Sequence, residues 1–365
     1  MELTDLMKIA MPHMKVNASS DLNLFSSLLH APGSGKSRNK ELSYRTLMLA
    51  SMTNGYVEGS SQLTGVSGQT VRNYIRNINP GRLLRINNDM IATLREMGVL
   101  KKPLMLALDW HDGMYYGAPG TDGVIGTKNS RGTNYAYEYA TISIVTKGLR
   151  FSIAIIPVRE RSILNMVRTT IHIVSNLDIK IKVLLMDGGF FSIDAINYLI
   201  SNNINFIMHV PKMEKGNMEI DKLYTTKNHN RKKGEQATFR FVTVYGRDKN
   251  GKIMLYAFAT STTLPSLSIL RIFKKRWGIE TGYRMIRKFL AKTTSRIYTI
   301  RMLYFFLAVL LYNFWVILNI KFRMRIIADV LRIMVASVLV TVNPFATHRN
   351  AINFHLENKG SGGDF

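Results

Sequence analysis

The chain has 365 residues, 46% of them hydrophobic, and this composition favours a folded globular protein over a disordered one. Its 49 Lys and Arg outnumber 24 Asp and Glu, and the formal net charge of +25 favours nucleic acid as a partner over an anionic membrane surface or a ribosome-like scaffold. The absence of cysteine excludes disulfides and thiolate zinc sites, so a metal would be held by carboxylates, water or histidine, which favours magnesium or manganese.

Residues 1–100 predict a helical, basic DNA-binding region, in which residues 43–80 have the layout of a helix-turn-helix. We expect one helix over 44–52, a short helix at 60–63, and a second helix capped by Ser67. The polar residues of this second helix that would face a DNA groove are Gln69, Thr70, Arg72 and Asn73. The alternative is an ordinary pair of packed helices whose polar face is merely solvated.

Residues 101–210 change to short apolar runs that alternate with helical segments. The expected order is three strands, a helix, a strand, a helix and a strand, at residues 104–108, 135–146, 149–158, 162–176, 181–186, 192–201 and 205–210. A hairpin meander that leads into strand–helix–strand units predicts an α/β fold with a mixed central sheet flanked by helices.

Residues 211–263 interrupt this alternation with two strand-like runs, 237–245 and 252–259, joined by a hairpin turn. The segment is much longer than the usual connection of about 2–8 residues, so it predicts a small β-rich insertion. Helical periodicity then returns over residues 264–289 and places Glu280 in the middle of a helix.

The stretch 302–320 is long and apolar enough to span a bilayer. It contains Asn313 and follows a strongly charged helix, so we interpret it as a buried core helix that completes the core over residues 264–320. A membrane protein built around this stretch is the alternative. Residues 321–365 predict a basic helical tail.

Three carboxylates occupy positions that suggest chemistry. Asp109 follows the first predicted strand, Asp187 follows the fourth, and Glu280 lies on the helix after the insertion. If those two strands are neighbours, their ends bring the carboxylates together. Three such groups repel one another unless divalent cations neutralise them. Two Mg²⁺ ions about 4 Å apart would stabilise the attacking and leaving oxygens of a phosphoryl displacement.

Each acid taken alone could instead cap a turn. Asp112 and Asp122 compete with Asp109 for the same role, and His111 is a candidate extra ligand or an outer neighbour of the site. We interpret Ser192 as a helix cap without a catalytic role.

The segment 275–284, Lys-Arg-Trp-Gly-Ile-Glu-Thr-Gly-Tyr-Arg, resembles the C-terminal signature of prokaryotic DDE insertion-sequence transposases. Their pattern is Tyr, two residues, Arg, three residues, Glu, six residues, Lys. Arg276 and Glu280 match it in type and spacing. Phe273 stands where Tyr is usual, and Arg287 stands where Lys is usual.

The segments around Asp109-Trp110 and Met186-Asp187-Gly-Gly-Phe-Phe resemble the two aspartate motifs of the same group, so the resemblance covers most of residues 100–320. It implies a ribonuclease H-like core with a β-strand insertion before the final Glu. It further implies that Asp109, Asp187 and Glu280 hold two Mg²⁺ or Mn²⁺ ions per active site. The residues expected to contact DNA there are Arg276, Tyr283, Arg284, Arg287 and Lys288. A plain ion pair between Arg276 and Glu280 is the alternative for that arginine.

The resemblance implies metal-dependent cleavage at transposon ends and strand transfer into target DNA. The expected partners are double-stranded DNA, as inverted repeats and target, and a second copy in a homodimer, with no membrane. We expect a cytoplasmic, nucleoid-associated protein. The insertion contains no Trp, so the candidates to stack on an end base are Tyr245, Tyr256 and Phe258. A stand-alone nuclease and a non-catalytic DNA-binding regulator are the competing hypotheses.

Overall fold

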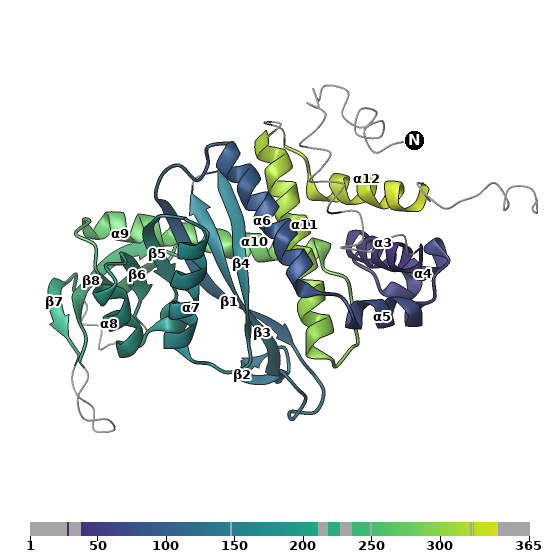
Figure 1. Ribbon diagram of the computed structural model, residues 1–365. Coiled ribbons are helices and arrows are strands. Elements are labelled where there is room, and N and C mark those ends of the chain that lie inside the picture. The colour runs from purple at the N-terminus through teal and green to yellow at the C-terminus, as the bar shows by residue number, and fades with distance from the viewer. Residues whose placement is uncertain are drawn as a thin grey trace, which may run out of the picture. The chain divides into compact units, whose positions relative to one another are not determined.

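The computed structural model describes residue 28 and residues 38–146, 148–210, 218–226, 236–248, 250–321, 323 and 325–341. The chain divides into two compact units, which we call the helical unit and the sheet unit. The helical unit comprises Met1–Ile86, Lys288–Thr293 and Ile326–Phe365, and the sheet unit comprises Asn87–Arg287 and Thr294–Arg325. Figure 1 shows the elements of both.

The helical unit contains the predicted helix-turn-helix. Its helices are α3 (Arg38–Thr53), α4 (Val57–Thr64), α5 (Gly68–Arg76), the start of α6 (Pro80–Glu96) and α12 (Ala328–Thr341). Gly65 ends α4 in the left-handed region at φ 71°, and its N–H donates to the carbonyl of Ser61. Ser67 caps α5 as predicted, because its side chain accepts from the backbone N–H of Thr70 at 3.1 Å.

The helix α12 belongs to the same unit as α3, although about 280 residues separate them in the chain. The Arg332 guanidinium donates to the backbone carbonyl of Met52 at 2.7 Å. Asp329 accepts from both Arg332 and Lys288. Of the predicted basic tail, residues 342–365 lie outside the described part of the chain.

The described part of the sheet unit contains one nine-stranded mixed sheet, ordered β2-β3-β1-β5-β6-β9-β8-β7, with β4 pairing β3. The strands are β1 (Leu104–Met114), β2 (Ile125–Ser130), β3 (Thr133–Thr146), β4 (Leu149–Val158), β5 (Ile181–Met186), β6 (Phe206–His209), β7 (Asp221–Thr225), β8 (Thr238–Arg247) and β9 (Ile253–Thr260). Strands β1, β5 and β6 run parallel, whereas β3 is antiparallel to β1 and β4. This is the predicted mixed sheet with its meander followed by two crossover units.

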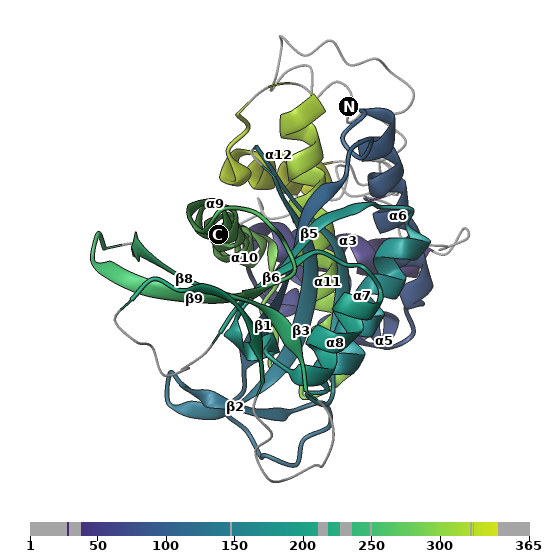
Figure 2. The same ribbon diagram turned by 90° about the vertical axis from the view of Figure 1, so that its left-hand side faces the viewer.

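Helices cover both faces of this sheet (Figures 1 and 2). On one face lie α7 (Ile163–Asn176) and α8 (Ile193–Ser201), which are the two crossover helices. On the other lie α10 (Gly278–Ile286) and α11 (Tyr298–Lys321), and α9 (Ser266–Phe273) packs beside β8. An 18-residue window of α11 has a mean hydropathy of 2.0, and 83% of that window is buried, so the apolar stretch is a core helix, as predicted.

Three local predictions are wrong in detail. Strand β1 does not end before Asp109 but continues to Met114, because β3 also pairs with the more polar residues from Asp109 to Met114. The helix predicted over 264–289 is broken between α9 and α10 by the 3₁₀ turn η2 (Lys274–Trp277). Ser192 stands at the N-cap of α8, but its side chain makes no capping hydrogen bond.

The insertion does not form a separate sheet. Strand β9 pairs antiparallel with β6, so β9, β8 and β7 extend the core sheet beyond β6. The sequence indicates β8 and β9 by their alternating pattern. It does not indicate β7 or β2, which are short and largely exposed edge segments without an apolar run.

Candidate active site

Asp109 lies inside β1, opposite Thr141 of β3, and is only 8% exposed. One carboxylate oxygen accepts from the Arg276 guanidinium at 3.0 Å, and the other accepts from the backbone N–H of Trp110 at 3.0 Å. Burial raises the pKa of Asp109 to about 7 against the lowering effect of Arg276, and the charges of Asp187 and Glu280 raise it further. The three predicted acids therefore share one electrostatic neighbourhood.

Asp187 directly follows β5, the parallel neighbour of β1, so the sheet itself brings it toward Asp109. Its side chain caps the 3₁₀ turn η1 (Gly188–Phe190) by accepting from the N–H of Gly189 at 2.8 Å. The rings of Trp110 and Phe190 stack with centroids 4.4 Å apart and planes 5° from parallel. This stack joins the residue after Asp109 to the turn after Asp187.

Glu280 lies in the first turn of α10 and is exposed. Arg284, four residues later, lies on the same side of α10, and Arg287 directly follows the helix; both are exposed. An acid followed by two exposed arginines suits a phosphate group held beside a metal-binding carboxylate.

Arg276 does not pair with Glu280, although the two lie four residues apart. It lies in η2, is 9% exposed and bonds Asp109 instead, with its guanidinium 5.3 Å from the centre of the Phe273 ring. Phe273, the departure from the usual Tyr, thus packs against the charge that neutralises Asp109. The Nε of Arg276 is buried and has no partner among the described residues.

Two other residues expected at DNA are engaged elsewhere. Tyr283 is 9% exposed, and its hydroxyl donates to the backbone carbonyl of Asp109 at 3.2 Å and shares a hydrogen bond with Thr141 at 2.7 Å. A buried hydroxyl with both partners in the sheet is not available to a phosphate. Lys288 belongs to the helical unit and pairs with Asp329 at 2.6 Å.

The rival acids have other partners. Asp112 points to the opposite face of β1 from Asp109, and its partner in the register of β1 and β3 is Glu138. Asp122 forms an exposed ion pair with Arg159 at 2.9 Å. Neither therefore replaces Asp109 beside Asp187.

His111 is 6% exposed and lies between the rings of Tyr283 and Phe305, each with its centroid 4.7 Å away. Burial lowers the pKa of His111 to about 3, and the positive charge of Arg287 adds to the effect. The imidazole is therefore neutral and packed between aromatic rings.

In the helix-turn-helix, Gln69 and Asn73 are exposed, and Thr70 and Arg72 are half-buried. Arg72 contacts the Glu58 carboxylate and donates to Gln69 at 2.9 Å, and Gln69 donates to Asn73 at 3.1 Å. The four polar side chains thus line one accessible side of α5.

Of the aromatic candidates in the insertion, Phe258 is fully buried and cannot stack on a base, whereas Tyr245 is 42% exposed and Tyr256 is half-buried.

Within the described residues, no group of three or more acidic, histidine or cysteine side chains is arranged to hold a metal ion as it stands. Arg276 supplies the positive charge at Asp109 in this state. Thr141 positions the site without any signal in the sequence. Trp110 and Phe190, which also position it, belong to the two segments that resemble aspartate motifs.

Comparison with known proteins bears on this geometry. The model of the transposase DDE domain family matches residues 159–314. This segment of the chain is therefore similar to the DDE domain of transposases. The match includes Asp187 and Glu280 and begins after β1, so the assignment of Asp109 depends on the geometry of the sheet.

The fold of this chain is similar to that of the piggyBac transposase in the cryo-EM structure of its synaptic complex with hairpin DNA. The TM-score is 0.55 at 11% sequence identity, over 98% of this chain and 85% of that chain. The similarity confirms the predicted ribonuclease H-like α/β fold. The sequence has no match among curated proteins.

Proposed function

We propose that this chain is a DNA transposase that cleaves DNA at the ends of its element and joins the freed 3′-hydroxyls to target DNA, with two divalent metal ions held by Asp109, Asp187 and Glu280. The supporting observation is that Asp187 directly follows β5, the parallel neighbour of the strand that carries Asp109, and that the charges of Asp187 and Glu280 both raise the pKa of the buried Asp109 carboxyl. Each of these two carboxylates therefore repels that of Asp109, and divalent cations with a preference for oxygen ligands would relieve the repulsion.

The donor set fits Mg²⁺ or Mn²⁺. Asp109 is fixed and desolvated, whereas Asp187 is half-buried and Glu280 is exposed, so the latter two side chains can adjust around an ion. When bound, the ions supply electrostatic stabilisation to the attacking and leaving oxygens of phosphoryl transfer. The chain holds Asp109 in place through the N–H of Trp110 and through Arg276.

We propose that Arg284 and Arg287 hold phosphates of the DNA end beside Glu280, with Arg276 joining them when it leaves Asp109. Guanidinium groups suit this role because they make charge-assisted, bidentate hydrogen bonds to phosphate oxygens. The exposure of Arg284 and Arg287, which follow Glu280 by four and seven residues, supports this assignment.

The DNA substrates we propose are the inverted repeats and the target duplex. The accessible polar residues of α5 support recognition of a groove by the helical unit. The similar piggyBac structure is a synaptic complex with hairpin DNA, which supports a homodimer that brings two ends together. The spacing of Arg276 and Glu280 supports a place among prokaryotic insertion-sequence transposases, and hence a cytoplasmic, nucleoid-associated protein.

The test is an oligonucleotide cleavage and strand-transfer assay with Mg²⁺ or Mn²⁺. Asp109→Asn and Glu280→Gln are each expected to abolish both reactions, because each removes a ligand charge. Asp122→Asn is the matched control, since that exposed acid pairs only with Arg159 and its loss leaves both reactions intact. Full activity of Asp109→Asn or Glu280→Gln would overturn the proposal, and cleavage without joined products would favour a nuclease.

A further inference from the structure

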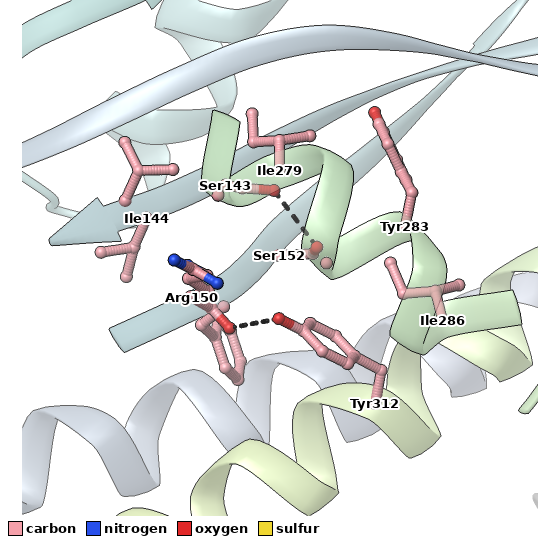
Figure 3. Close-up of a pocket in the computed structure, with 12 residues that line it drawn as sticks. Ser143, Ile144, Arg150, Ser152, Ile279, Tyr283, Ile286 and Tyr312 are labelled. Carbon is pink, nitrogen blue, oxygen red and sulfur yellow. Dashed lines mark hydrogen bonds between the residues drawn. The ribbon is translucent and has the colours of Figure 1, made fainter. Parts of the chain in front are cut away.

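Tyr283 connects the helix that carries Glu280 to the strands beneath it. It lies three residues after Glu280, one helical turn along α10, and faces the sheet while Glu280 faces solvent. Figure 3 shows its ring extending from α10 on the side away from Tyr312 of α11. The side chain is 9% exposed.

The Tyr283 hydroxyl bridges two paired strands at one position. Asp109 of β1 and Thr141 of β3 are direct partners in the sheet. The hydroxyl donates to the backbone carbonyl of Asp109 at 3.2 Å and lies 2.7 Å from the hydroxyl of Thr141. With its single proton given to the carbonyl, the Tyr283 oxygen accepts from Thr141, so both strands are tied to one atom of α10.

The Tyr283 ring is also held from the side. His111 packs against it with ring centroids 4.7 Å apart, and Phe305 of α11 stacks on His111 at the same centroid distance.

We propose that Tyr283 is a positioning residue of the transposition reaction, which sets the place of Glu280 relative to Asp109 by fixing α10 to the paired residues Asp109 and Thr141. The proposal rests on the proposed function, in which Asp109 and Glu280 share metal ions. A group that orients a metal ligand from outside the coordination shell commonly affects metal affinity or activity by about 10–100-fold when removed. The Glu280 side chain itself is exposed, so its position depends on how α10 is held against the sheet.

The decisive variant is Tyr283→Phe, which keeps the ring and its contact with His111 and removes only the bridging hydroxyl. We expect its affinity for Mn²⁺, measured by electron paramagnetic resonance of free Mn²⁺ without DNA, to fall roughly tenfold. We expect kcat for cleavage to fall by a similar factor, while the KM for DNA stays unchanged. Thr141→Val removes the second hydrogen bond and should lower the Mn²⁺ affinity in the same direction.

Tyr312→Phe is the matched control. Tyr312 is 3% exposed, and its hydroxyl donates to the backbone carbonyl of Arg150 at 2.8 Å, as Figure 3 shows. The control therefore loses a comparable buried hydrogen bond between a helix and a strand, away from the three acids. It should lower the thermal midpoint about as much as Tyr283→Phe and leave Mn²⁺ affinity unchanged.

Two results would overturn the proposal. If Tyr283→Phe loses stability like the control but binds Mn²⁺ like the unmodified protein, the tyrosine is merely structural. If KM for DNA rises while kcat and Mn²⁺ affinity hold, it contacts DNA instead. Failure of the proposed function gives a different signal, because Asp109→Asn and Glu280→Gln would then bind Mn²⁺ normally whatever Tyr283→Phe does. If Tyr283→Phe does not fold, Thr141→Val alone decides.

Discussion

Asn313 gives the sharpest test of how the core beneath the site is held. It lies in the middle of the apolar helix α11 and is fully buried. Its side-chain amide makes hydrogen bonds to the backbone of β4 of the kind that a neighbouring strand would make. Its oxygen accepts from the N–H of Ser152 at 3.0 Å, and its nitrogen donates to the carbonyl of the same residue at 2.8 Å. A third bond runs to the Asn87 side chain at 3.3 Å, and that amide donates to the carbonyl of Ile153 at 2.7 Å.

Strand β4 pairs only with β3 among the described strands, so its second edge is satisfied by these amides and not by a further strand. In Asn313→Leu the shape is nearly kept, but the N–H and C=O of Ser152 and the Asn87 oxygen lose a partner. Ser152 and Asn87 are 3% and 5% exposed, so water does not replace the lost Asn313 amide. At about 1–3 kcal/mol for each unsatisfied buried group, and allowing for adjustment of Asn87, the expected loss is about 3 kcal/mol of unfolding free energy.

The measurement is urea unfolding followed by circular dichroism, with the loss appearing as a lower midpoint at an unchanged slope. The control is Asn176→Leu on α7, whose exposed amide bonds only to His172 and whose loss should shift stability by less than about 0.5 kcal/mol. A loss below about 1 kcal/mol for Asn313→Leu would refute the reasoning, because the edge of β4 would then be satisfied without this amide.

Three further outcomes follow from the geometry. Trp110→Ala removes the ring that stacks on Phe190, so metal-dependent cleavage should fall by about 10–100-fold, whereas Trp110→Phe should retain most of it. Gly123→Ala places a Cβ within the Tyr298 ring at a φ of +74°, and chemical unfolding should show a loss of about 2 kcal/mol or more. Burial raises the pKa of Glu138 above its unfolded-state value near 4.5. The contribution of this group to stability is therefore full below pH 4.5 and is lost as pH rises through the folded-state pKa. The unfolding free energy of Glu138→Gln should accordingly increase relative to that of the unmodified protein as pH rises from 4.5, which unfolding curves at several pH values would measure.

The core strands and crossover helices could be predicted because their signals are local. The runs that became β4 and β5 are predominantly apolar segments, and their predicted limits agree with the structure. The cap of α5 by Ser67 is equally local, since a serine three residues before a free N–H makes that bond within one turn. Glu280 could be placed on a helix from periodicity, and its spacing from Arg276 could be read directly.

The choice of partners could not be predicted in the same way. Asp109 lies inside β1 because β3 continues to pair beyond it, and no apolar pattern in the residues from Trp110 to Met114 reveals that pairing. The burial of Tyr283 depends on which side of α10 meets the sheet. Both facts follow from contacts between separate segments of the chain, which periodicity within one segment does not contain.

The turn η2 explains how two residues four apart come to serve different groups. In a continuous α-helix, Arg276 and Glu280 would lie on the same face and pair with each other. A 3₁₀ turn advances each residue by a third of a full rotation instead of the smaller α-helical step, and η2 ends at Trp277, between them. Arg276 accordingly faces Asp109 in the sheet while Glu280 begins α10 facing solvent. In the proposed function, Arg276 and a metal ion compete for the Asp109 carboxylate, and Arg276 becomes available to a DNA phosphate when it leaves that carboxylate.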